Sequence, residues 1–250
     1  DVLVLEQQGE PERPQAARLP DDLMRLLTHA GAALADVDVF AVATGPGSFT
    51  GLRIGIAAMQ GLAFAGGKPL VGISALDALA STTHHPPSTA HQPAPATHAW
   101  IDAWRGEVYA ATYLDGHEVE PPVVARPADL LREVGERRRL RTESVFIGNG
   151  AVTYRELILS TLGRLATIAE PAAPPLAAAI AGLAFEEAQA GRLAPSHAIM
   201  PVYVRRTYAE LAREREAVID ACRFEPLGGE EDLQGVLEVE GESFTNPWTR

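Results

Sequence analysis

Apolar and polar positions along the first third of the chain alternate in a way that predicts strands and helices in turn. The apolar run at residues 37–43 has the length of a strand, and its lack of polar gaps is typical of a strand buried on both faces. Residues 50–65 follow a glycine-containing loop and stop at Gly66-Gly67, which predicts a helix. A short strand at 70–73 and a helix at 75–80 come next. This alternation predicts an α/β fold.

The stretch before these elements has a weaker pattern of the same kind. Residues 2–5 predict a short strand. Pro20 has the fixed φ angle suited to the first turn of a helix, and the leucines that follow it recur at helical spacing. We therefore expect a helix that starts at Pro20 and ends at Gly31.

The second half repeats the α/β theme after an interruption. Residues 81–97 hold four prolines, several Ser and Thr and three His, which predicts a loop or insert without regular structure. We expect two lobes that divide near this insert. The elements predicted beyond it are strands at 98–101 and 107–113 joined by a tight turn at 102–106, a second turn at 115–116, a helix at 127–134, a strand at 145–147 that ends in a turn at 148–150, and a helix at 176–189.

Composition and charge narrow the classes of function. The chain of 250 residues is 46% hydrophobic and 22% charged, which allows a sizeable buried core. Its formal net charge of −12 fits direct binding to a nucleic acid poorly. Seven acidic residues and no Lys or Arg lie between 224 and 249, and the basic run at 137–141 has acidic neighbours, which indicates a solvated helix end. No apolar stretch is long enough for a membrane span. The single cysteine, Cys222, fits a reducing cytoplasm.

The segment that most favours a binding site is the glycine loop before the helix predicted at 50–65. Its glycines permit positive φ angles and close approach of a phosphate or another backbone, and the helix behind it presents unpaired N–H groups. The spacing matches neither a Walker loop nor the dinucleotide-binding pattern. Gly51 and Gly55, four residues apart, equally favour close packing between helices, so anion binding and packing both remain open. The glycine loop consists of Gly45, Pro46, Gly47, Ser48 and Thr50.

Other polar residues give weaker evidence for a metal site or a catalytic site. His84, His85, His91 and His98 lie near one another in sequence, but no carboxylate lies among them, so we interpret them as a surface cluster and predict no metal site. Asp102 could be a catalytic carboxylate, yet its place at a tight turn beside Gly106 favours a turn-forming role. We predict no catalytic residue.

Four segments, in order and with consistent spacing, resemble the TsaB (YeaZ) family over residues 1–206. The most specific is Gly45 to Gly55, within the longer block 39–80. The others are Asp102-Ala103-Trp104-Arg105-Gly106-Glu107-Val108-Tyr109, Gly148-Asn149-Gly150-Ala151 followed by Tyr154, and Pro201-Val202-Tyr203-Val204-Arg205.

The resemblance implies an actin-like (ASKHA, ribonuclease H-like) fold of two lobes. It further implies a cytoplasmic, non-catalytic scaffold that activates the catalytic paralogue TsaD. That complex forms N6-threonylcarbamoyladenosine at position 37 of tRNAs reading codons that start with adenine. TsaE is a further partner, tRNA is contacted only indirectly, and ATP or ADP can bind at the partner interface; without its partner the chain can form a homodimer. The residues assigned to the partner interface are Gly51, Leu52, Gly55, Ala58, Met59 and Leu62.

Two regions depart from the family pattern. The family opens with a strand ending Asp-Thr-Ser, and this sequence begins after it, so residues 1–5 match the family's second strand. Residues 222–250 resemble the opening strand and helix of RimI-type N-acetyltransferases, although an acidic helix capping the domain is an alternative. The expected organisation is therefore an N-terminal lobe at 1–98, a C-terminal lobe at 99–206, a linker at 207–222 and a partial acetyltransferase at 223–250.

Two other classes of function compete with the scaffold. The first is an independent actin-like kinase or hydrolase, which needs phosphate loops in both lobes. The second is a metalloprotease, suggested by the related glycoprotease (M22) family, and none of the seven histidines stands in a His-x-x-x-His or His-Glu-x-x-His pattern.

Overall fold

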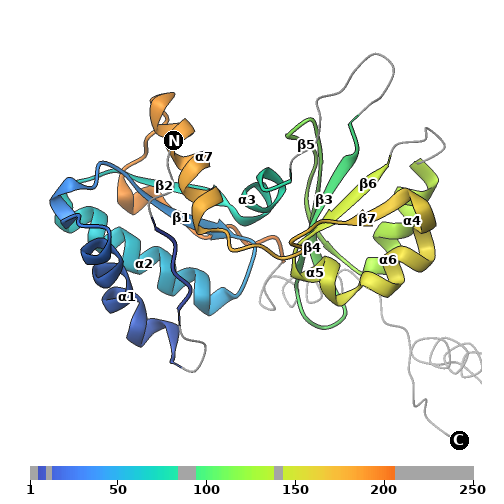
Figure 1. The fold of residues 1–250 in the computed structure, drawn as a ribbon, viewed down its shortest axis with the longest axis horizontal. Coiled ribbons are helices and arrows are strands. Elements are labelled where there is room, and N and C mark those ends of the chain that lie inside the picture. The colour runs from blue at the N-terminus through green and yellow to red at the C-terminus, as the bar shows by residue number, and fades with distance from the viewer. Residues whose placement is uncertain (1–4, 10–12, 84–93, 138–142, 206–250) are drawn as a thin grey trace, which may run out of the picture. The chain divides into compact units, whose positions relative to one another are not determined.

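The structure is a computed structural model that describes residues 5–9, 13–83, 94–137 and 143–205 (Figure 1). Its regular elements form two separate β-sheets, one of two strands and one of five. The predicted α/β class is confirmed. The linker at 207–222, the acetyltransferase-like segment at 223–250, and His84, His85 and His91 lie outside the described residues.

The first sheet pairs β1 (Phe40–Gly45) with β2 (Leu70–Ser74) in parallel, with Phe40 opposite Leu70. The two faces of β1 are buried under different helices because neighbouring side chains of a strand point in opposite directions. Phe40 and Val42 pack with α2 (Phe49–Gly66), whereas Val39 and Ala41 pack with α7 (Ala177–Gln189). The continuous apolar run that predicted this strand reflects that double burial.

Helix α1 (Gln15–His29) begins earlier than predicted, with Pro20 in its interior. Proline has no N–H to donate to the carbonyl of Ala16, but Ala16 is exposed and its carbonyl can be hydrated. The helix ends as expected, with Gly31 in a left-handed conformation at φ 69°. The strand predicted at 2–5 falls mostly outside the described residues, and Leu5 itself belongs to no strand.

The second sheet has the strand order β5-β4-β3-β6-β7. Strands β3, β4 and β5 are antiparallel neighbours, and β6 and β7 are added in parallel. The predicted hairpin turns at 102–106 and 115–116 are both present, with Gly106 and Gly116 at positive φ. The strand bounds are β3 (Ala96–Asp102), β4 (Val108–Leu114), β5 (His117–Ala125), β6 (Ser144–Ile147) and β7 (Ala166–Ile168).

Helices cover both faces of the second sheet. On one face Trp100, Phe146 and Leu131 form a cluster with residues of α4 (Pro127–Arg137), α5 (Asn149–Thr153) and α6 (Arg155–Leu162). On the other face α3 (Ala75–Ser81) packs through Leu76 and Leu79. Short 3-10 helices at Leu34–Asp36, Gly163–Leu165 and Ser196–Ala198 complete the described elements.

After the second sheet the chain returns to the first. Ala184 of α7 packs against Val71 and Ile73 of β2. Further on, the amide of Val202 donates a hydrogen bond to the carbonyl oxygen of Thr44 at 2.8 Å. Part of the lobe predicted at 99–206 therefore builds the first lobe, and the second sheet begins at Ala96.

Candidate functional site

The glycine loop lies between β1 and α2 and is covered by the chain's own C-terminal segment. Gly45 has φ 119°, and a Cβ atom on it would lie 2.8 Å from the carbonyl oxygen of Val202. Since a phosphate and a carbonyl oxygen repel each other, this neighbour makes the backbone at Gly45 a poor anion cradle. Gly45 and Pro46 are joined by a cis peptide bond. At Gly45, the geometry favours the packing interpretation of the loop.

Two backbone N–H groups in the first turn of α2 are hydrogen-bonded to Ser48. Ser48 is the N-cap, and its Oγ accepts from the backbone N–H of Gly51 at 3.3 Å. The carbonyl oxygen of Ser48 accepts from the N–H of Leu52 at 2.9 Å. Thr50, which follows the cap, is exposed. Anion binding by the free N–H groups of this first turn stays a prediction.

The residues predicted for the partner interface lie on the inner side of α2. A Cβ on Gly51 would meet Gln15 Oε1 of α1 at 3.3 Å, and a Cβ on Gly55 would meet Val42 Cγ2 of β1 at 4.0 Å. Met59 and Leu62 pack against the cluster of Phe40, Val42 and Ile56. Ala58 is half-buried. Gly51 is therefore close to a neighbour within the molecule, whereas Gly55 has room for a Cβ atom.

An apolar groove of about 1130 Å³ opens along this inner side. It is bounded by α1, α2, β1 and α7, and among its lining residues are Leu23, Gly55, Met59 and Ile180. Gly51, Leu52 and Leu62 also line it, so five of the six predicted interface residues share one concave surface.

The outer side of α2 carries a different stripe of residues, which the sequence analysis did not select. Phe64 is 83% exposed and Phe49 is 49% exposed. Arg53, Ala57 and Gly61 lie between them on the exposed side. We call these five residues the outer stripe of α2; their i, i+4 and i, i+3 spacing would have identified them.

An aromatic cluster joins the outer stripe to the C-terminal segment. The Phe49 and Tyr203 rings stack with centroids 5.2 Å apart, and the Arg53 guanidinium lies 3.9 Å from the centroid of Phe49. Arg53 Nε donates a hydrogen bond to Tyr203 Oη at 2.9 Å. The guanidinium has further donors at its Nη atoms, which can serve an acceptor on another molecule.

Asp102 forms the turn predicted for it. Its Oδ1 accepts from the amide of Trp104 at 3.0 Å, and its own amide donates to Asn149 Oδ1 at 2.9 Å. Trp104 and Arg105 follow in left-handed backbone conformations, at φ 55° and 59°. Trp104 is exposed, which the sequence analysis did not anticipate.

His98 is not part of a surface cluster, and that interpretation is wrong for this residue. It lies in β3 at 5% exposure and stacks on Phe146 with centroids 4.7 Å apart. Its alternation with Ala96 and Trp100 along a strand was the signal for burial. In the described part of the chain, no three His, Cys, Asp or Glu residues come together in a way that could hold a metal ion. No helix in that part is long and apolar enough to cross a membrane.

Comparison with known proteins places the chain in a family. A family model described as "TsaD: tRNA N6-adenosine threonylcarbamoyltransferase" matches residues 11–213. A solved structure described as YeaZ from Pseudomonas aeruginosa is 30% identical, with a TM-score of 0.56, over 76% of this chain and 84% of that one. The chain belongs to the TsaB (YeaZ) family. Its two lobes are those of the actin-like ASKHA fold.

Two relatives of the TsaB (YeaZ) family carry the name tRNA threonylcarbamoyladenosine biosynthesis protein TsaB. The one from Escherichia coli strain K12 is 33% identical over 150 residues, which cover 58% of this chain and 62% of that protein. The one from Bacillus subtilis strain 168 is 28% identical over 217 residues, which cover 84% of this chain and 88% of that protein. The match to the Escherichia coli protein thus spans somewhat less than two thirds of its length.

Proposed function

We propose that this chain acts in the formation of N6-threonylcarbamoyladenosine at position 37 of tRNA, as the non-catalytic TsaB subunit that pairs with a catalytic TsaD. Membership of the TsaB (YeaZ) family is the observation that carries this proposal. In this role the chain holds TsaD in its active form, tRNA is bound mainly through the partner, and TsaE joins the assembly. All of this takes place in the cytoplasm.

The pairing surface is α2 together with α1. The outer stripe of α2 offers two exposed phenylalanines with Arg53 and two small residues between them, a composition suited to a protein–protein contact. The groove lined by Gly51, Leu52, Gly55, Met59 and Leu62 adjoins it through the same helix. ATP or ADP would bind where the two subunits meet, and a second copy of the chain would occupy this surface when TsaD is absent.

An independent actin-like kinase or hydrolase is the alternative. Such an enzyme would use the glycine loop for phosphate, and the Val202 carbonyl oxygen at Gly45 disfavours that use. ATP turnover by the purified chain alone, lost on Asp102→Ala, would favour the enzyme and overturn the scaffold.

Restoration of the modified nucleoside tests the proposed role directly. A bacterium depleted of its own TsaB is supplied with this chain and the TsaD of the same genome, and threonylcarbamoyladenosine is measured in digested tRNA by mass spectrometry. We expect the modification to return only when both proteins are present. Its return with this chain alone, in cells that also lack TsaD, would contradict the non-catalytic role.

Charged substitutions test the pairing surface. Phe64→Asp should abolish co-purification with TsaD and leave the melting temperature within a few degrees of wild type, because Phe64 is 83% exposed. Val152→Asp is the matched control, since Val152 is 49% exposed on α5, which packs on the second sheet. Equal binding by wild type and Phe64→Asp would remove the outer stripe from the interface.

A further inference from the structure

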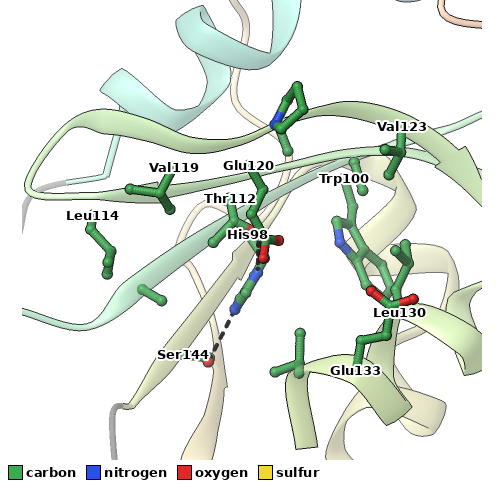
Figure 2. A pocket seen from close by; sticks show the side chains of 15 residues that line it. His98, Trp100, Thr112, Leu114, Val119, Glu120, Val123, Leu130, Glu133 and Ser144 are labelled. Atoms are coloured by element: carbon green, nitrogen blue, oxygen red, sulfur yellow. Dashed lines mark hydrogen bonds between the residues drawn. The ribbon is translucent and has the colours of Figure 1, made fainter. Parts of the chain in front are cut away.

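The cavity on the second sheet beside α4 leaves few groups for a ligand to bind (Figure 2). Both ring nitrogens of His98 already lie 3.1 Å from a hydroxyl oxygen, that of Thr112 at Nδ1 and that of Ser144 at Nε2. Trp100, which also lines the cavity, is 2% exposed. A charged group with unused donors is found elsewhere, on the outer stripe of α2.

Arg53 of the outer stripe is held against two aromatic rings. Phe49 precedes it by one helical turn, and the central guanidinium carbon of Arg53 lies 3.9 Å from the centroid of the Phe49 ring. The same carbon lies 5.9 Å from the centroid of Tyr203, which stacks on Phe49. Arg53 Nε also donates a hydrogen bond to Tyr203 Oη at 2.9 Å. Together these contacts fix one orientation of the guanidinium.

Tyr203 is itself fixed, because the segment 194–205 is bound to the protein on both sides of it. Before Tyr203, the amide of Val202 donates to a carbonyl oxygen at the end of β1 at 2.8 Å. After it, Arg205 forms an ion pair with Glu107. The fold therefore sets the position of the hydroxyl that accepts from the guanidinium.

The two Nη atoms of Arg53 remain for another molecule. Among the described residues, no acceptor bonds to these atoms and no Asp or Glu forms an ion pair with this exposed side chain. The two Nη atoms form a fork that fits both oxygens of a carboxylate. Because the side chain is already ordered, binding at this fork loses less side-chain entropy than binding at a mobile arginine.

The neighbours of this charge favour a protein carboxylate over a phosphate. Phe49, Tyr203, Val202 and Met200 are all exposed apolar or aromatic side chains on the same two segments as the cluster. A single cation with apolar neighbours suits one carboxylate on a protein surface. A phosphate group carries about 1.5 to 2 negative charges, and in the described part of the chain no second Lys or Arg lies on the two rings.

We propose that Arg53 is the polar anchor of the pairing surface and binds an Asp or Glu side chain of the partner subunit. The proposal rests on the proposed function, because the partner is the TsaD that pairs with α2. The Nη fork would take both carboxylate oxygens, and the apolar residues beside it would exclude water from the pair. Tyr203 is a positioning residue, since its hydroxyl holds Nε and leaves the two Nη atoms for the partner.

Arg53→Met tests the anchor, because methionine keeps an unbranched apolar side chain and removes the charge. Affinity for purified TsaD of the same genome is measured by isothermal titration calorimetry at low and at high NaCl concentration. We expect about tenfold weaker binding at low salt, and a smaller loss of affinity on adding salt than wild type shows. Arg164→Met, on the exposed 3-10 helix Gly163–Leu165, is the control for removal of a positive charge and should bind as wild type does.

Two results would overturn the anchor alone. One is wild-type affinity in Arg53→Met while Phe64→Asp fails to bind, which would leave the proposed function standing. The other is weaker binding by Arg53→Met with the salt dependence of wild type, because that combination indicates a role in packing only. Failure of the wild-type chain to bind TsaD would instead remove the proposed function together with this inference.

Tyr203→Phe tests the positioning role, because it keeps the stacked ring and removes the acceptor. We expect about threefold weaker binding to TsaD with the salt dependence of wild type. The Arg53 Nε proton should also exchange faster with water, which NMR spectra of the free chain measure. Unchanged exchange of that proton, or unchanged affinity for TsaD, would contradict the role of the Tyr203 hydroxyl.

Discussion

At the scale of single residues, the carbonyl of Trp100 lies where a side chain at position 148 would begin. A Cβ on Gly148 would stand 2.0 Å from that oxygen, and Gly148 has φ 112°, which L side chains rarely adopt. Gly148→Ala should therefore cost about 2–5 kcal/mol of unfolding free energy, from backbone strain and overpacking together. Urea unfolding measures this loss.

Gly61 gives the opposite expectation on α2. A Cβ there would meet nothing within 4 Å, and the residue is exposed in the middle of a helix. Gly61→Ala should raise the unfolding free energy by up to about 1 kcal/mol, because alanine loses less backbone entropy in a helix. Urea unfolding at equal protein concentrations checks this. A destabilised variant would mean that Gly61 meets a neighbour in solution, such as a second copy of the chain.

The pair of Tyr113 and Asp77 links the second sheet to α3. Tyr113 Oη donates to Asp77 Oδ1 at 2.6 Å, and burial, together with this bond and the charge of Asp77, raises the pKa of Tyr113 well above its ordinary value. Tyr113→Phe should cost about 1.5–3 kcal/mol at neutral pH, the contribution of a hydrogen bond to a charged group.

The stability lost in Tyr113→Phe should depend on pH, because folding raises the pKa of Tyr113. A pKa raised by folding favours the protonated tyrosine, so its contribution is complete below the unfolded pKa of about 10 and declines as pH rises above it. The difference between wild type and Tyr113→Phe should therefore shrink above about pH 10. Urea unfolding at a series of pH values measures it, and a difference that grew with pH would contradict this direction.

At the scale of elements, the sequence predicted best those elements that have a clear helical period or an uninterrupted apolar run. Strand β2 and helices α2, α3 and α7 are found within one or two residues of the predicted bounds, and β1 is displaced by two to three. Strand β5 was missed because Pro121 and Pro122 argue against a strand, although β5 lies at the sheet edge, where a missing N–H is tolerated. Helix α6 was also missed, and the three-residue β7 has too few residues for a clear pattern.

The candidate site was predicted less well than the fold. The glycine spacing on α2 predicted close packing, but a spacing does not tell whether the neighbour belongs to the same molecule. Only the fold shows that a Cβ on Gly51 would come within 3.3 Å of Gln15 in α1, whereas a Cβ on Gly55 would stand 4.0 Å from Val42 in β1 and would fit. The aromatic cluster of Phe49, Arg53 and Tyr203 joins residues 150 positions apart, which no local pattern contains.

Gln60 fixes the C-terminal segment to α2 and provides a test at this scale. Its Nε2 donates to the carbonyl oxygens of Ser196 and Ile199 at 3.0 and 2.9 Å. Gln60→Met keeps the length of the side chain and removes both donors, which should cost about 1–3 kcal/mol and speed amide exchange near Ile199. Gln189→Met at the exposed end of α7 is the control, and equal unfolding of the two variants would show that these bonds contribute little.

At the scale of the whole molecule, the chain leaves the first sheet after α3, builds the second sheet and returns through α7. Helix α3 is the physical link, because Ala78 packs in the cluster of Val71, Ile73 and Ala184, while Leu76 and Leu79 pack in the cluster of Ala99, Tyr113 and Ile147. A helix shared by two cores couples their stabilities. Residues 1–205 should therefore unfold as one cooperative unit.

Leu79→Ala tests this coupling. Leu79 is buried against the second sheet, and its truncation should cost about 2–5 kcal/mol through lost contacts and a residual cavity. Native-state hydrogen exchange is followed at two sites, the amide of Ala110 in β4 and the amide of Val42 in β1, which faces β2 in the parallel register. If the two cores unfold together through α3, both amides should lose protection by the same free energy, although only β4 belongs to the sheet that Leu79 contacts. Loss of protection at Ala110 with none at Val42 would mean that the two sheets unfold separately.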